Sequence, residues 1–212
     1  QQMLLAHLER RRIRPRDDAL GAIAATLAPG DEPLEFMQAA SMLTAAQELV
    51  LPGHTTSVAM IGNGLVRLLE DRTRWRLLVE NPDLVAGAVE EVARFDNPVH
   101  GFLRVTTRPV TLAGRDLPAG AEVLLVYASA NRDEALCDRP EVFDPTRGPT
   151  AHLGFALGPH FCPGAPLGRV QVRIALETLA QRLPDLRLDP DHEVVMRRDF
   201  TMRGPVTLPV RW

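Results

Sequence analysis

The chain has 212 residues, of which 45% are hydrophobic, and it carries a formal net charge of −3. This composition is typical of a globular domain, and it gives no electrostatic reason to expect binding to nucleic acid or to an anionic membrane. Because the sequence contains no apolar run of about 18 residues, we expect no membrane-spanning helix. The two cysteines do not form a disulfide framework, which favours a reducing, cytoplasmic location.

The first third of the chain is predicted to be helical. Short helices are expected at residues 3–12 and 19–27. A helical pattern then continues over residues 33–69, a length that normally crosses a whole domain core. Its only turn signal is Pro52-Gly53. Pro52 lacks an N–H and its ring obstructs the carbonyl of the preceding turn, so we expect an interruption and a kink there.

The middle of the chain changes from helices to short strands. Helices are expected at residues 73–80 and 82–95. Short β-prone runs separated by Gly-containing turns predict strands at residues 102–107, 110–112 and 122–126. The Pro- and Asp-rich segment 131–151 is expected to be irregular. Beyond it we expect a helix at 167–183 and a small terminal sheet from residues 186–188, 193–195 and 206–210.

The most informative segment is 152–164, with the sequence His-Leu-Gly-Phe-Ala-Leu-Gly-Pro-His-Phe-Cys-Pro-Gly. It places Cys162 in a Gly/Pro-rich loop that leads directly into a helix. Free backbone N–H groups and the positive end of the helix dipole both favour a thiolate at this position. A thiolate serves mainly as a metal ligand or as a nucleophile, and the simpler alternative is a buried structural thiol. For Cys137 a structural role is expected.

Three further features accompany this loop. Glu91 and Arg94 are three residues apart and share one helix face, although such a pair alone is often a surface pair of little energetic value. Hydroxyl side chains follow Pro52 in the long helix, in the segment 52–57. The irregular segment 131–147 contains several arginines.

In this order and at these intervals, the four features resemble the cytochrome P450 family in its soluble bacterial type, from about Glu35 to Trp212. The resemblance implies an α+β, mostly α-helical fold with small antiparallel sheets. Residues 1–212 then form a partial cytochrome P450 domain that lacks the N-terminal half. Within it we expect the distal helix at about 33–69, the Glu-x-x-Arg helix at about 82–95, the Cys loop at 152–164 and the proximal helix at about 167–183.

The resemblance implies that Cys162 is the metal ligand, the proximal thiolate of a haem b iron. A thiolate donates electron density to iron and favours O–O cleavage. Phe155 matches the aromatic residue that packs against this ligand. Gly158 and Gly164 match glycines that let the backbone approach the porphyrin. Ala156 stands where glycine is common.

Two polar residues match positions that bind the haem propionates. His160 lies in the Cys loop, and Arg104 lies ten residues after Arg94. A guanidinium suits a carboxylate in bidentate geometry. The alternatives are an exposed loop histidine and a solvated strand arginine.

Glu91 and Arg94 match a structural ion pair whose third member is an arginine of the irregular segment. Val142 stands where that arginine is often found. Arg139 and Arg147 are the two alternatives, and we favour Arg147.

The distal helix departs from the family pattern. Aligned without a gap, Thr55 takes the position of a carboxylic acid, and Thr56 takes that of the threonine beside it. We predict that both are catalytic. A hydroxyl can relay a proton through water but cannot supply one as a carboxylic acid does. Alternatively, both hydroxyls hydrogen-bond to helix carbonyls.

The first hypothesis is therefore a monooxygenase, as in bacterial secondary metabolism, that inserts one oxygen atom from O2 into a small organic substrate. Its expected partners are the substrate and a ferredoxin with its reductase, and neither nucleic acid nor a membrane. The missing acid at Thr55 motivates a second hypothesis, a peroxide-using or non-oxygenating haem-thiolate enzyme. The missing N-terminal half motivates a third, a non-catalytic helper that binds no haem.

Two observations leave further alternatives open. Arg169 and Arg173 lie one helical turn apart after the Cys loop, either as a solvated face or as part of a docking patch for an acidic electron donor. The missing half means a C-terminal fragment, one half of a complex, or a degenerate relative.

Overall fold

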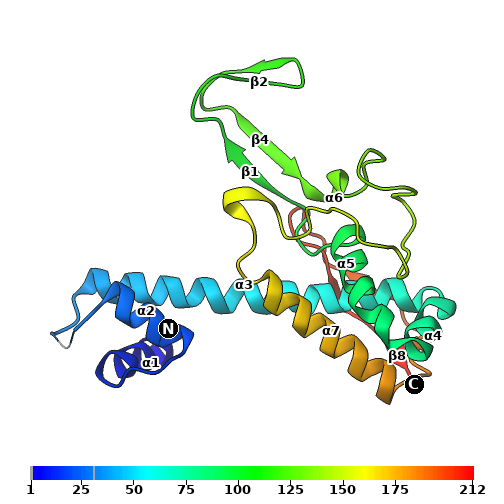
Figure 1. Cartoon of the computed structure of the whole chain (residues 1–212), viewed down its shortest axis with the longest axis horizontal. Coiled ribbons are helices and arrows are strands. Elements are labelled where there is room, and N and C mark those ends of the chain that lie inside the picture. The colour runs from blue at the N-terminus through cyan, green and yellow to red at the C-terminus, as the bar shows by residue number, and fades with distance from the viewer. Residues whose placement is uncertain (1, 31) are drawn as a thin grey trace. The chain divides into compact units, whose positions relative to one another are not determined.

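The computed structural model describes residues 2–30 and 32–212, and the chain divides after Thr55 into two compact units. Figure 1 shows the elements of both units coloured along the chain. The helix α3 (Phe36–Leu69) contains the boundary, so its first part belongs to the first unit and its second part to the second. A helix that spans a bilayer combines about 18 or more residues with a strongly apolar composition, and no helix in the described part of the chain has both.

The first unit contains α1 (Gln2–Ile13), α2 (Ala19–Leu27) and the first part of α3. Asp18 caps α2, because its carboxylate accepts a hydrogen bond of 2.8 Å from the backbone N–H of Gly21. A small core joins the helices and consists of the buried side chains of Leu8, Ala24, Ala28, Met42 and Ala46.

The long helix continues through the point at which we expected an interruption. Pro52 and the five residues that follow it all lie within α3, so the expected interruption is wrong. A proline in a helix interior costs about 3 kcal/mol, but helix formation is cooperative and the turns on both sides stay helical. The flanking helical residues therefore outweigh the local effect of Pro52.

The second unit is built on a helical core. It contains the second part of α3, α4 (Arg72–Glu80), the 3-10 turn η1 (Pro82–Leu84), α5 (Val85–Phe95) and α7 (Ala165–Arg182). One face of α5 is apolar and buried, and it packs against α7. The shared core includes Trp75, Leu78, Val89, Val172 and Leu176.

Small sheets complete this unit. Within the described residues, the strands pair as two-stranded antiparallel sheets: β1 (Gly101–Val105) with β4 (Glu122–Val126), β2 (Val110–Leu112) with β3 (Arg115–Leu117), β5 (Arg187–Leu188) with β8 (Val210–Arg211), and β6 (Val195–Met196) with β7 (Pro205–Thr207). The pairs β1–β4 and β2–β3 extend away from the helices of this unit (Figure 1). The predicted fold class, mostly helical α+β with small antiparallel sheets, is confirmed.

The differences from the predicted elements are local. The helix expected at 82–95 begins with η1, and the helix expected at 167–183 begins two residues earlier, at Ala165. The strand β3 was not expected, because two of its three residues, Arg115 and Asp116, are charged and Asp is depleted in strands. It is paired with β2 through a tight turn at Ala113 and Gly114, which both have positive φ, as a type I′ turn requires. Two short elements, α6 (Tyr127–Ala130) and η2 (Gly158–His160), lie on either side of the irregular segment.

Candidate functional site

The Cys loop forms a closed turn in front of α7. The backbone N–H of Cys162 donates a hydrogen bond of 2.9 Å to the carbonyl of Phe155, which joins the two ends of the turn. Two residues inside it have left-handed backbone, Ala156 at φ 59° and Gly158 at φ 68°. Glycine tolerates this conformation, whereas alanine is strained there by about 1–2 kcal/mol. Gly158 therefore adopts its left-handed backbone without strain, whereas Ala156 is strained in the same loop.

Cys162 lies at the N-terminal end of α7, with Gly164 as the N-cap residue. Its side chain is half-buried and forms no disulfide. A Cβ added at Gly164 would lie 3.7 Å from the Cys162 sulfur, which is an ordinary contact. Apolar side chains of the same loop face solvent, with Leu157 76% exposed and Phe161 48% exposed. A thiol beside exposed apolar side chains fits a flat apolar macrocycle bound through its metal.

The loop is anchored to α5 at its other end. A Cβ added at Gly154 would lie 2.2 Å from the carbonyl oxygen of Ala93, so only glycine allows this approach. The backbone N–H of Leu153 donates to Oδ1 of Asn131 at 2.6 Å. The segment before Phe155 therefore has a defined position relative to α5.

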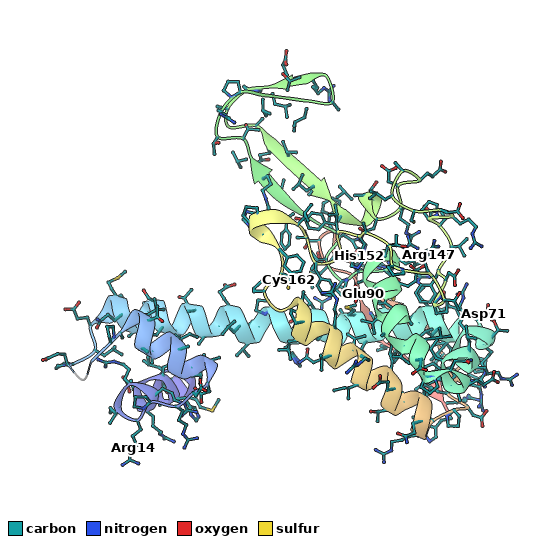
Figure 2. The ribbon with its side chains drawn as sticks, viewed as in Figure 1. Arg14, Asp71, Glu90, Arg147, His152 and Cys162 are labelled. Carbon is teal, nitrogen blue, oxygen red and sulfur yellow. The ribbon has the colours of Figure 1, made fainter. Side chains whose placement is uncertain are left out.

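A second anchor is the carboxylate of Glu90 on α5. It accepts hydrogen bonds from Nε and Nη2 of Arg169 on α7, at 2.7 and 2.9 Å, and lies 3.1 Å from Nε2 of His152. The backbone N–H of Gly154 donates to Nδ1 of His152, so Nδ1 carries no proton and Nε2 donates to Glu90. Figure 2 shows Glu90 and His152 beside each other. Burial of Glu90 acts to raise its pKa, but the hydrogen bonds from His152 and Arg169 and the Arg169 charge lower it to about 2.

The guanidinium of Arg169 also lies over the ring of Phe155, with 4.3 Å between Cζ and the ring centroid. Its hydrogen bonds with Glu90 raise its pKa above the usual value. Arg173, one turn further, pairs with Glu177 at 3.6 Å. Both arginines therefore have acidic partners within the chain, which removes much of the charge that the proposed docking patch requires.

The structure brings Glu91, Arg94 and Arg147 together. Arg94 and Glu91 form two parallel hydrogen bonds of 2.8 Å, and Nε of Arg147 donates to Glu91 at 3.2 Å. Burial acts to lower the pKa of Arg94, but the pair with Glu91 outweighs it and raises the pKa. Arg139, the alternative third member, lies instead near Asp138 and Asp144.

These arginines hold the irregular segment in place. Arg94 donates to the carbonyls of Asn131 and Pro140, each at 2.9 Å. Arg147 donates to the carbonyl of Val142 at 2.9 Å. A segment without regular hydrogen bonding is thus fixed through its carbonyl groups.

The other predicted residues lie on separate elements. His160 ends η2 and is exposed, and Arg104 on β1 is half-buried and pairs across the sheet with Val123. Thr55 and Thr56 lie within α3, the first exposed and the second half-buried. The unit boundary falls between these two threonines.

Sequence reasoning missed Glu90 and His152. The two partners of Glu90, Arg169 and His152, lie 79 and 62 positions away from it in the chain, so no local spacing indicates either contact. The only signal was the doubled acid Glu90-Glu91, which places two carboxylates on adjacent faces of one helix. Sequence reasoning also missed Ser57, whose hydroxyl donates a hydrogen bond of 2.6 Å to the side-chain oxygen of Gln171 on α7.

A cysteine thiolate is one of the protein ligands that hold a haem iron. Residues 31–208 match the family model described as Cytochrome P450. The chain therefore belongs to the cytochrome P450 family, and the resemblance stated from the sequence is confirmed.

Curated relatives and solved structures agree with this assignment. The chain is 39% identical over 205 residues to the vitamin D(3) 25-hydroxylase of Pseudonocardia autotrophica, and the aligned region covers 96% of this chain and 50% of the relative. It is 37% identical over 207 residues to the cytochrome P450 monooxygenase PikC of Streptomyces venezuelae, and the aligned region covers 97% of this chain and 49% of PikC. A solved structure, CxnD, is described as a cytochrome P450 enzyme for C–S bond formation in chuangxinmycin biosynthesis. It matches this chain with a TM-score of 0.87 and 37% sequence identity, and the match covers 99% of this chain and 52% of the CxnD chain. The chain spans about half the length of the curated relatives it matches.

Proposed function

We propose that the protein is a haem-thiolate monooxygenase that inserts one oxygen atom from O2 into a small organic substrate. The observation that carries this proposal is the position of Cys162, in a closed loop directly before α7. Membership of the cytochrome P450 family supports it. The names hydroxylase and monooxygenase given to two relatives also support it.

In this proposal Cys162 ligates the iron of haem b. The bound haem supplies O2 activation, and electron donation by a thiolate favours O–O cleavage. Phe155 packs against the ligand, while Gly158 and Gly164 keep the backbone of the loop in its left-handed turn and helix start. The half-buried position of the thiol limits its contact with water and oxidants.

His160 and Arg104 bind the haem propionates as hydrogen-bond donors. A guanidinium pairs well with a carboxylate because its N–H groups form a fork. Glu91, Arg94 and Arg147 brace the segment before the Cys loop through the buried ion pairs described above.

Thr56 and Thr55 handle protons on the distal side. A threonine hydroxyl donates one hydrogen bond and accepts others, so each can pass a proton to or from water. Thr55 stands where an acid was expected and contributes no proton of its own at neutral pH. Electrons come from a ferredoxin and its reductase, and the protein works in the cytoplasm.

The test is the spectrum of the reduced, carbon monoxide-bound protein, prepared with whatever chain precedes Gln1 in the natural protein. We expect the red-shifted Soret band of thiolate-ligated haem, and its loss in Cys162→His. A Soret band typical of histidine ligation in the unaltered protein would overturn the proposal. Purified protein without stoichiometric haem would favour the non-catalytic helper instead.

A second function, a peroxide-using or non-oxygenating haem-thiolate enzyme, is favoured by two observations. Thr55 replaces the acid of the distal helix, and a similar protein is described as forming a C–S bond. Turnover with peroxide, but none with O2 and an electron donor, would favour it. In that case Thr55→Asp should increase O2-dependent turnover, whereas efficient O2-dependent turnover of the unaltered protein would exclude it.

A further inference from the structure

We propose that Glu90 and Arg169 form a charge-compensating pair beside the Cys162 loop, in which the carboxylate of Glu90 offsets the positive charge of Arg169 and so sets the reduction potential of the bound iron. The inference rests on the proposed haem ligation by Cys162. It concerns residues that the resemblance did not assign to any role at the haem.

The first support is the geometry of the ion pair. Glu90 and Arg169 form two hydrogen bonds of 2.7 and 2.9 Å between α5 and α7. Their side chains are 40% and 35% exposed, so solvent screens the pair only in part. Bidentate pairs of this kind fix both position and orientation of the guanidinium.

The second support is the contact between Arg169 and the Cys loop. The guanidinium carbon lies 4.3 Å from the centroid of the Phe155 ring. The backbone carbonyl of Phe155 accepts the hydrogen bond from the N–H of Cys162 at 2.9 Å. A cation oriented by Glu90 is therefore stacked on the residue that holds the backbone of the cysteine.

The third support is that Glu90 also holds the beginning of the loop. Its carboxylate accepts from Nε2 of His152, and His152 accepts from the N–H of Gly154. One carboxylate thus connects the entry of the loop at 152–154 with the first turns of α7 at its exit. Figure 2 shows Glu90, His152 and Cys162 in this region of the second unit.

The electrostatic consequence has a definite sign. Reduction adds a negative charge to the iron centre, so a nearby positive charge raises the reduction potential and a nearby negative charge lowers it. Arg169 and Glu90 therefore act in opposite directions and largely cancel. Loss of either charge leaves the other uncompensated in a partly desolvated site, where charge interactions exceed those in water.

The experiment measures the midpoint potential of the haem-loaded protein by redox titration. Glu90→Gln is expected to raise the potential and Arg169→Gln to lower it, each on the order of a tenfold change in the equilibrium constant for one-electron reduction, or about 59 mV. The double variant is expected to return close to the unaltered protein. Glu90→Asp keeps the charge and should shift the potential less than Glu90→Gln.

Arg173 and Glu177 provide a matched control, because they form an ion pair on the same helix at 3.6 Å and are 49% and 42% exposed. Arg173→Gln and Glu177→Gln should leave the potential unchanged. Shifts of both Glu90→Gln and Arg169→Gln in the same direction would indicate loosening of the loop and overturn the proposal, as would no shift in either. If the unaltered protein lacks the thiolate Soret band, the proposed function fails. If the band is present and the potentials do not move in opposite directions, only this inference fails.

Discussion

Arg94 and Glu91 form a closed fork, with two hydrogen bonds of 2.8 Å, one turn apart on α5 and almost without solvent contact, since Arg94 is 1% exposed. The same carboxylate accepts from the backbone N–H of Asp144 at 2.9 Å and from Arg147. The helix and the irregular segment are therefore joined at one buried carboxylate.

We predict that Glu91→Gln lowers the free energy of unfolding by about 3–5 kcal/mol, because it leaves a buried guanidinium uncompensated. Chemical denaturation measures this change. Glu70→Gln is the control, since Glu70 forms an exposed i,i+3 pair with Arg67 and should change stability by less than about 1 kcal/mol. Equal effects of the two substitutions would contradict the prediction.

The lowered pKa of Glu90 predicts a dependence of stability on pH. Its pKa falls from 4.5 to about 2 in the folded chain, so the folded state binds the proton less well than the unfolded state. Glu90 therefore stabilises the fold above about pH 4.5 and loses this effect as the pH falls through about 2. The difference in stability between the unaltered protein and Glu90→Gln should shrink over that range, as urea denaturation at several pH values can measure. A constant difference would exclude this origin.

The left-handed backbone at Ala156 predicts a stabilising substitution. At φ 59° an alanine is strained, so Ala156→Gly should raise the free energy of unfolding by about 1 kcal/mol. Ala175→Gly, in the interior of α7, should lower it by about 1 kcal/mol because glycine disfavours helix. Denaturant midpoints of the two variants should therefore move in opposite directions, and a loss of stability in Ala156→Gly would refute the assignment of strain.

The close approach of the Cys loop to α5 predicts that Gly154→Ala is poorly tolerated. The added Cβ would lie 2.2 Å from the carbonyl oxygen of Ala93, which forces the loop or the helix to move at a cost of about 1–3 kcal/mol. Gly148→Ala is the control, because a Cβ there meets no atom within 4 Å. Thermal unfolding compares the two. If Gly154→Ala matched Gly148→Ala in stability, the loop would not be packed as described.

Much of the fold follows from local patterns. The helix α2 was predicted with its observed bounds, Ala19–Leu27. The strand β4 was also predicted with its observed bounds between turn signals. The interruption predicted at Pro52 was wrong, because the helical segments on both sides of Pro52 keep the helix continuous through it.

The sequence by itself determined the Cys162 loop, the pairing of Glu91 with Arg94, and the family to which the chain belongs, since each depends on residues close together along the chain or on the order of such motifs. Only the tertiary structure decided that Arg147 reaches Glu91 across 56 positions, and that Arg169 and His152 meet at Glu90. The physical reason is that an ion pair forms where folded segments meet. The position of these segments is set by the packing of α5 against α7 and by the hydrogen bonds to the carbonyls of the irregular segment. Neither of these can be predicted from the spacing of residues along the chain.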